Sequence, residues 1–179
     1  MRRFLYHYLV FLTIGLTACS SASAPPPVTQ LPAVTIDNTK IIAGQTVYVP
    51  AYSHIYMWNQ NQTMNLSATL SVRNTDMTNP IIIASVNYHD SDGQLVRQYL
   101  DQAIELGSLA STTFVVDRED TSGGFGAAFI VEWVTQTEVS LPVIEAIMIN
   151  TSGNQGISFV SPGRVIKSRT NDASQQTNL

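Results

Sequence analysis

Alternation of apolar and polar residues is clearest in residues 64–74 and predicts a half-buried strand there. Successive side chains of a strand point to opposite faces of its sheet, so every second residue reaches the core. The apolar positions of this segment are Leu66, Ala68, Leu70 and Val72. Further strands are predicted at residues 47–56, 81–89, 95–100, 113–116, 127–134, 143–150 and 156–165, the last interrupted at Pro162 and Gly163.

The spacing of these strands predicts the fold class. Asp90-Ser91-Asp92-Gly93 separates two of them and has the residues of a tight hairpin turn. The segments between the strands lack the periodicity of an amphipathic helix. About eight short strands separated by Asn, Asp, Gly and Pro turns predict an all-β domain, an antiparallel β-sandwich that is immunoglobulin-like in the loose sense. A small closed β-barrel is the alternative that the same pattern allows.

The amino-terminal residues have the pattern of an exported lipoprotein. Two arginines precede an apolar run over residues 4–16, which is shorter than the roughly 20 residues that a membrane-spanning helix needs. The run ends at Leu16-Thr17-Ala18-Cys19, which resembles the bacterial lipobox, in which the cysteine thiol receives a diacylglyceryl group. We therefore predict a lipoprotein signal peptide over residues 1–18 and a lipid on Cys19 that anchors the chain in a membrane.

Composition divides the rest of the chain. Residues 19–33 are rich in Ser, Ala and Pro and predict an extended tether behind the lipidated cysteine. Residues 34–167 carry the strand pattern and form the predicted domain, and the polar residues 168–179 predict a disordered tail. Ser20 resembles the sorting signal of outer-membrane lipoproteins, so in a host with two membranes we expect the domain to face the periplasm from the outer membrane.

The net charge and the small number of reactive side chains exclude several classes of function. The net charge is −4 and becomes more negative once Arg2 and Arg3 are removed, which argues against a nucleic-acid partner. Cys19 is the only cysteine, so the domain has neither a disulfide nor a thiol nucleophile. The domain keeps two histidines, His54 and His89, and lacks the common hydrolase motifs. We expect a protein that is not an enzyme and needs no metal or cofactor; a metal-assisted hydrolase, in which both histidines converge with Asp90 or Glu132, is a third choice.

An aromatic face on residues 47–58 is the first candidate binding surface. Strand alternation places one set of residues on one side, namely Tyr48, Tyr52, His54, Tyr56 and Trp58. Tyrosine and tryptophan offer flat area to a sugar ring or a partner protein if they are exposed, and they pack a core if they are buried. Pro50 cannot donate to a strand ladder, so it predicts that this strand lies at a sheet edge or contains a bulge.

Two polar loops are the remaining candidates. Asp90 and Asp92 begin like a calcium loop, but the strand resumes immediately after Gly93, so a hairpin turn is the favoured interpretation. Residues 117–126 contain Arg118, Asp120 and three glycines without the Lys-Ser or Lys-Thr pair of a phosphate-binding loop. This segment is interpreted as a long connection, with a binding loop as the alternative.

Several segments together resemble a family of bacterial lipoproteins that is defined as a domain of unknown function. They are residues 44–56, Arg73-Asn74-Thr75-Asp76, Asp90-Ser91-Asp92-Gly93, Gly123-Gly124 and residues 155–164. The resemblance covers nearly all of residues 34–166 and implies export, while it supplies no activity, ligand or catalytic residue.

The sequence thus predicts a lipid-anchored protein of the cell envelope that acts as a non-enzymatic binding or protein-interaction module. The expected partners are the membrane, through the lipid on Cys19, and an envelope protein or a saccharide. The alternative is a small-ligand or glycan-binding lipoprotein that uses the aromatic face.

Overall fold

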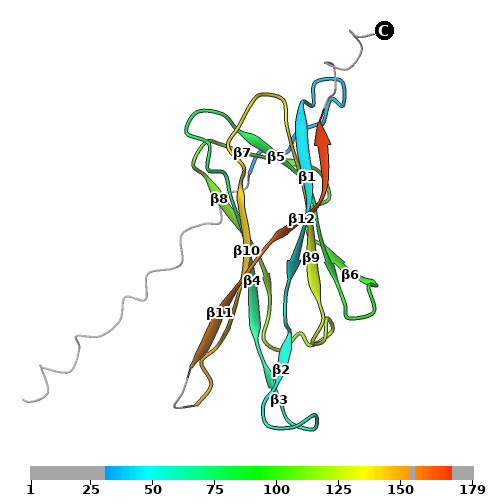
Figure 1. Cartoon of the computed structure of the whole chain (residues 1–179), viewed down its shortest axis with the longest axis vertical. Coiled ribbons are helices and arrows are strands. Elements are labelled where there is room, and N and C mark those ends of the chain that lie inside the picture. Colours follow the sequence, from blue (N-terminus) through cyan, green and yellow to red (C-terminus); the bar gives the residue numbers. More distant parts are fainter. Residues whose placement is uncertain (1–30, 154–155, 171–179) are drawn as a thin grey trace, which may run out of the picture. The chain divides into compact units, whose positions relative to one another are not determined.

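The computed structural model describes residues 31–153 and 156–170, which form two antiparallel sheets and a separate hairpin (Figure 1). One sheet has the order β12-β1-β9-β5-β6, with β7 also paired to β5. Its strands are β1 (Ala43–Pro50), β5 (Ile81–His89), β6 (Leu95–Gln98), β7 (Ile104–Leu106), β9 (Ala128–Thr135) and β12 (Arg164–Thr170). The other sheet, in the order β11-β10-β4-β8, contains β4 (Ser67–Arg73), β8 (Ser111–Val116), β10 (Val143–Asn150) and β11 (Ile157–Pro162). The hairpin consists of β2 (His54–Tyr56) and β3 (Thr63–Asn65).

The core lies between the inner faces of the two sheets. All four apolar positions of the 64–74 pattern are fully buried, as the alternation predicts. They meet inward-facing residues of the opposite sheet, among them Val49, Phe129, Val131 and Trp133. The sheets keep free edges and do not close into a barrel, so the predicted antiparallel β-sandwich is confirmed and the barrel alternative is wrong. In residues 31–153 and 156–170, no helix is long and apolar enough to span a membrane.

The segment predicted as one strand over residues 47–56 is divided into β1 and β2. β1 lies inside its sheet, between β12 and β9, so the edge position allowed by Pro50 is wrong for this strand. The alternative, a bulge, is present in β1, because its pairing with β12 shifts register between Thr46 and Val47. Pro50 is tolerated because it is the last residue of β1. The pairing of β1 with β12 has already ended at Tyr48, so no strand needs a donor from Pro50. The next N–H, that of Ala51, points toward β9 and donates to the carbonyl oxygen of Ala127 at 2.9 Å.

Strand pairing extends beyond residues 34–167, the limits expected for the domain, at both ends. Ala33 forms an isolated bridge with Ile104 of β7, a strand that the sequence pattern did not reveal. At the other end β12 continues to Thr170, which pairs with Ala43. The residues expected to be a polar tail therefore begin with the last paired residues of a strand, and the rest of that segment lies outside the described residues. The predicted signal peptide, Cys19 and most of the predicted tether also lie outside them.

The chain changes sheets at Pro162-Gly163, where the sequence predicts an interruption. β11 pairs with β10 in one sheet, and β12 pairs with β1 in the other. A Cβ on Gly163 would lie 2.7 Å from the carbonyl oxygen of Ile144 and 2.6 Å from a methyl group of Val47. Glycine is therefore required at this corner because the backbone passes directly against both sheets.

Asn74 and Asp76 tie together the loops at the end of the sandwich opposite the β2–β3 hairpin. The Asn74 Nδ2 donates to the carbonyl oxygens of Asn79 (2.8 Å), Leu106 (3.2 Å) and Gly107 (2.9 Å). The Asp76 carboxylate, whose residue is 9% exposed, accepts backbone N–H groups from Thr78 (2.9 Å), Asn79 (2.8 Å) and Ser140 (2.9 Å). These two buried side chains thus have a structural role, since they satisfy backbone groups of several loops.

Acidification is expected to weaken the fold through Asp76. Backbone hydrogen bonds, first from Asn79 and then from Thr78 and Ser140, lower the pKa of Asp76 from 3.8 to about 2. The charged carboxylate therefore stabilises the folded state fully above the unfolded pKa, and this stabilisation is lost as the pH falls from about 4 toward 2. Urea unfolding midpoints measured across this range should fall steeply for the wild type and less for Asp76→Asn. Asp92→Asn, in an exposed turn, is the control that should retain the full pH dependence.

Candidate functional site

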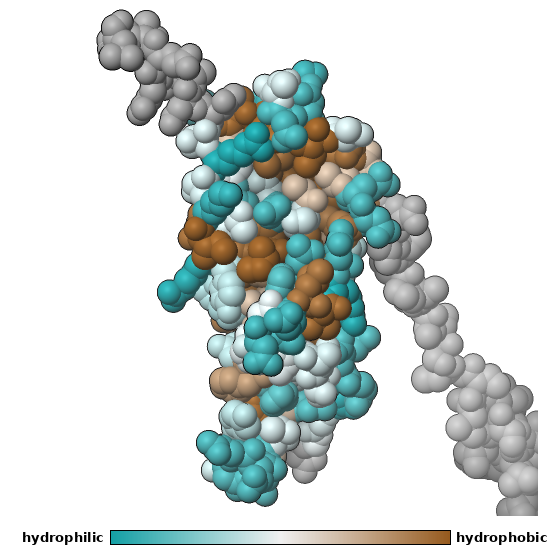
Figure 2. Space-filling view, turned by 90° about the vertical axis from the view of Figure 1, so that its right-hand side faces the viewer, coloured by the Kyte–Doolittle hydropathy of each residue, from teal (hydrophilic) through white to brown (hydrophobic). Residues whose placement is uncertain are grey.

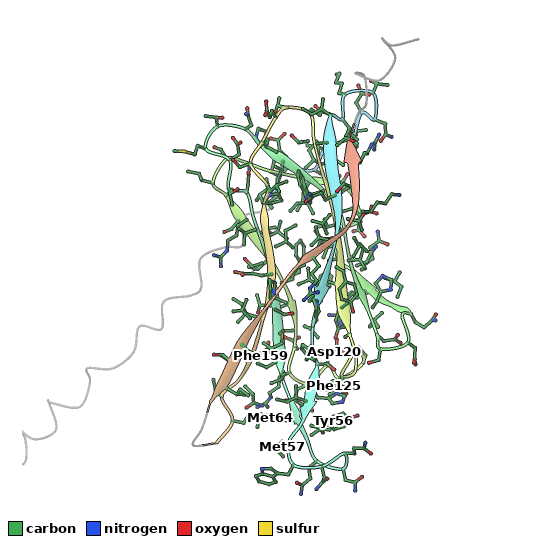
Figure 3. The ribbon with its side chains drawn as sticks, in the orientation of Figure 1. Tyr56, Met57, Met64, Asp120, Phe125 and Phe159 are labelled. Carbon is green, nitrogen blue, oxygen red and sulfur yellow. The ribbon has the colours of Figure 1, made fainter. Side chains whose placement is uncertain are left out.

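Four aromatic side chains meet at the end of the sandwich next to the β2–β3 hairpin, and we call them the aromatic cluster. They are Tyr52, Tyr56, Phe125 and Phe159. They come from the link between β1 and β2, the end of β2, the loop before β9, and β11. Figure 3 shows Tyr56, Phe125 and Phe159 at this end, with Met57 and Met64 beside them. The cluster therefore joins segments of both sheets that are far apart in the sequence.

The geometry of the cluster combines core packing with exposure. Tyr52 is half-buried against the main core and meets Phe125 edge-on at 5.4 Å and Phe159 at 5.8 Å. Tyr56 stacks on Phe125 with ring centroids 5.2 Å apart and an angle of 26°. Tyr56 is nevertheless 48% exposed and Phe125 43% exposed. The inner rings thus fix the outer ones, which present apolar area to solvent at little cost in side-chain entropy.

The loop that carries Phe125, residues 117–127, is held by two serines from other parts of the chain. The buried Ser53 donates its hydroxyl to the carbonyl oxygen of Gly124 at 3.0 Å, and its N–H contacts the same oxygen at 3.2 Å. Ser91 donates its hydroxyl to the Gly123 carbonyl at 3.1 Å and accepts the Gly126 N–H at 2.8 Å. Because both flanks of Phe125 are bonded to the sandwich, the loop presents its aromatic ring in one position.

An ion pair and a close packing contact complete the support of this loop. Arg97 donates to the Asp120 carboxylate at 2.7 Å, and a hydrogen bond from Ser122, followed by that from Arg97, holds the pKa of Asp120 below its usual value. The ring of Tyr88 passes under Gly123 and leaves no room for a Cβ there. Burial, with a smaller contribution from the Asp120 charge, raises the pKa of Tyr88 to about 12, so its hydroxyl stays protonated.

The residues of the predicted aromatic face do not form one surface. Tyr52, His54 and Tyr56 do lie together, and the rings of His54 and Tyr56 meet edge-on at 6.2 Å. Tyr48 is separate, because it lies within the sheet between Ile130 and Arg164. Trp58 lies beyond the cluster in the β2–β3 hairpin loop and is 84% exposed. The segment thus packs against the core at Tyr52 and is exposed from Tyr56 onward. The interpretation as core applies to Tyr52, and the interpretation as an exposed surface applies to Tyr56 and Trp58.

Asp90 and Asp92 belong to the hairpin turn between β5 and β6, as the favoured interpretation has it. Asp90 Oδ1 accepts the N–H groups of Asp92 at 2.9 Å and Gln94 at 2.8 Å, and Gly93 adopts a φ of 79°. These bonds use the Asp90 carboxylate to build the turn. His89 contacts the same turn, since its Nδ1 lies 3.1 Å from the Gly93 carbonyl oxygen.

Arg118 lies beside a shallow hollow at the base of the β2–β3 hairpin. It pairs with Glu119 at 2.7 Å and donates to the Ser152 hydroxyl. The hollow is also lined by Met57, Met64, Asn65 and Asn150. It adjoins the aromatic cluster, so the predicted residues Arg118 and Asp120 contribute differently: Arg118 borders the exposed surface, whereas Asp120 holds the loop.

The structure does not assemble the residues of the metal-assisted hydrolase. Within the residues that the structure describes, no three His, Asp, Glu or Cys side chains come together in a way that could hold a metal ion. Glu132 points to the outer face of its sheet, as alternation predicts, and accepts a hydrogen bond from the Ser85 hydroxyl at 3.2 Å. His54 lies with the aromatic cluster instead, and His89 lies in the β5–β6 turn.

Sequence reasoning missed Phe125 and Phe159 as members of the site. The signals that point to Phe125 are its neighbours Gly124 and Gly126, because a large apolar residue between glycines in a polar loop needs a packing partner. Phe159 carries no such local signal, since a phenylalanine in a strand usually belongs to the core. Its place in the cluster depends on the sheet order, which brings β11 to the outside of β10.

The fold and the site together define an all-β sandwich protein with an exposed aromatic cluster at one end. A family model described as "Protein of unknown function (DUF3124)" matches residues 44–166, and the chain belongs to this family. No curated protein sequence matches the chain. Among solved structures, a crystal structure of the Thermotoga maritima protein 1070 is similar with a TM-score of 0.41 and 12% identity, over 67% of this chain and 92% of that one.

Proposed function

We propose that the protein is a lipid-anchored component of the cell envelope that binds a partner protein through the aromatic cluster and the β2–β3 hairpin. It performs no catalytic step of its own. The observation that carries this proposal is the exposed Tyr56–Phe125 stack, which packs against the half-buried ring of Tyr52 and is fixed by hydrogen bonds at both flanks of Phe125. Rigid, exposed aromatic side chains are the residues that dominate binding at protein interfaces.

The place where the described chain begins supports a role in which the domain holds the aromatic cluster away from the membrane. The described chain begins with residues 31–33, which attach to β7 in the half of the sandwich opposite the β2–β3 hairpin (Figure 1). A membrane anchor on Cys19 would therefore be connected to one half of the domain, and the aromatic cluster lies at the other. The extended tether predicted from the Ser, Ala and Pro composition adds reach between membrane and domain.

Photo-crosslinking in intact cells tests the binding surface. A benzophenone amino acid is placed at Trp58, in the hairpin loop, and in a second strain at Leu141, which is exposed in the loop before β10. A discrete covalent adduct is expected at position 58 and none at position 141. Adding Phe125→Ala should lower the adduct yield about tenfold or more, since loss of an interface hot spot costs about 2 kcal/mol or more. Equal adducts at both positions, or none at position 58, would refute the proposal.

A saccharide is the second candidate ligand, because of the composition of the hairpin loop. Trp58 is almost fully exposed, and four exposed amide residues follow it, namely Asn59, Gln60, Asn61 and Gln62. Flat rings beside amide donors and acceptors suit the apolar face and the hydroxyl groups of a sugar.

Intrinsic fluorescence distinguishes this second candidate. The chain has two tryptophans, and Trp133 is buried in the core, so a saccharide that stacks on the loop changes the emission of Trp58 alone. Titration with peptidoglycan fragments should shift the emission to shorter wavelength and protect Trp58 from iodide quenching. The Trp58→Phe variant retains the Trp133 signal and should show no response. A wild-type response that survives in Trp58→Phe would count against the loop as the sugar site.

A further inference from the structure

A hollow of about 300 Å³ lies on the outer face of the sheet that contains β1, and none of the residues of the aromatic cluster lines it. Figure 2 views the molecule from the side of β12 and β6, where apolar side chains gather in the upper half. A small second core of buried residues, namely Ile41, Ile82, Ala103 and Val134, also lies on the outer side of this sheet. Ile36 and Ile41 from the segment before β1 provide an apolar wall of the hollow.

Two features of the backbone create the hollow. Gly44 has no side chain, and a Cβ there would lie 2.6 Å from the carbonyl oxygen of Trp133, so only glycine allows β1 and β9 to pair at this point. Beside it, the pairing of β5 with β9 shifts register between Ile83 and Ser85, which leaves Ala84 at an irregularity. Such irregularities in strands are often found beside functional sites. Because Gly44 and Ala84 have little or no side chain, the strand backbone forms the floor of the hollow.

Charged side chains of opposite sign stand on the two sides of this floor. Lys167 and Arg169 of β12 lie opposite Thr46 and Gly44, while Glu132 of β9 lies opposite Thr46 from the other side. All three line the hollow, and none of them forms an ion pair with any of the described residues. Two strand spacings of about 4.8 Å separate the Cα atoms of Lys167 and Glu132. Lysine and glutamate side chains are long enough to bridge this separation, yet no ion pair joins them in the structure, so both charges remain open to a ligand.

We propose that this hollow binds a small zwitterion with an apolar body, of the size of a dipeptide or tripeptide. The carboxylate of the ligand lies at Lys167 and Arg169, its ammonium group lies at Glu132, and its small side chains contact Ile36. An extended peptide advances about 3.3–3.6 Å per residue, so two or three residues span the distance between the two charged sides. The volume of the hollow is at the lower end of the range for ligand-binding pockets, so the hollow cannot fully enclose a larger peptide.

Calorimetric titration of the full-length chain in detergent with three matched probes tests this assignment. The probes are trialanine, its N-acetyl form without the ammonium group, and its C-terminal amide without the carboxylate. Trialanine is expected to bind saturably at one site. Each modified probe is expected to bind up to about fivefold more weakly, which is the loss of affinity expected for a partly exposed ion pair. Absence of saturable binding of trialanine at millimolar concentration would overturn the proposal.

Charge-neutral variants then assign each end of the probe. Glu132→Gln should weaken trialanine about fivefold and leave the affinity for the N-acetyl form unchanged, because that form has no ammonium group to lose. Lys167→Gln should weaken trialanine and leave the amide unaffected. Arg164→Gln, on the same strand but outside the hollow, and Glu138→Gln, in the exposed loop after β9, are matched controls that should bind as the wild type does. Equal effects of controls and site variants, or no effect of either site variant, would refute the site.

Discussion

Replacing Cys19 with serine is expected to abolish acyl labelling of the protein and to leave an uncleaved or soluble chain. Serine lacks the thiol to which the lipid of the proposed lipobox is attached. Each buried methylene of an acyl chain contributes about 0.8 kcal/mol to membrane binding, so loss of the lipid removes the anchoring energy that the acyl chains supply. Metabolic labelling with a radioactive fatty acid, followed by separation of membrane and soluble fractions, measures both effects.

A neighbouring substitution separates lipidation from general damage to export. Ser20→Ala leaves the thiol in place and should retain acyl label and membrane association. The size of the Cys19→Ser chain on a denaturing gel reports whether residues 1–18 are still attached. Acyl label that persists in Cys19→Ser would show that the lipid is carried elsewhere, and it would refute the anchor proposed at this position.

Gly123→Ala is expected to destabilise the protein by about 3 kcal/mol and to loosen the aromatic cluster. A Cβ on Gly123 would overlap the Tyr88 hydroxyl and lie 2.7 Å from the Cβ of Ala127, so either the ring or the loop must move. Overpacking of this kind costs about 1–3 kcal/mol. Because the Gly123 carbonyl accepts the Ser91 hydroxyl, displacement of the loop also releases the support of Phe125. Urea unfolding measures the loss of stability.

Two further variants connect this loss to the specific contact. Tyr88→Phe removes the hydroxyl, which is buried and has no hydrogen-bond partner among the described residues, and by itself should change stability little. In the double variant it should recover about half of the loss, since the Ala127 contact remains. Gly107→Ala, at a glycine with no atom within 4 Å of the added Cβ, is the control that should unfold as the wild type does. A double variant as unstable as Gly123→Ala alone would contradict the mechanism.

The parts of the fold that could be predicted are those with local signals. Alternation in residues 64–74 identified β4 and its buried face, because burial on one side of a strand imposes a period of two residues. The turn at Asp90-Ser91-Asp92-Gly93 was likewise predictable, since its hydrogen bonds are made within the turn itself. β10 was predicted with its exact limits, because its apolar run begins after Pro142 and ends at Asn150, before the polar residues Thr151 and Ser152.

The parts that could not be predicted depend on partners far along the chain. The division of residues 47–56 into β1 and β2 follows from the replacement of strand pairing by the bonds of Ser53 to Gly124. β7 is only three residues long and is stabilised by pairing with β5 and by the bridge to Ala33. The aromatic cluster was half predicted: Tyr52 and Tyr56 share a local pattern, whereas Phe125 and Phe159 reach them only through the order of the strands.

Pairing of β1 with β12 joins the beginning and the end of the domain, since Ala43 lies opposite Thr170. The first strand therefore receives one of its two neighbours only after the last residues of the domain have been synthesised. Folds dominated by such distant pairings have a high contact order and fold slowly. During synthesis the incomplete chain lacks its closing strand and cannot complete the sandwich. This delay suits the export that we propose, because a chain that has not yet folded can still be threaded through a translocation channel.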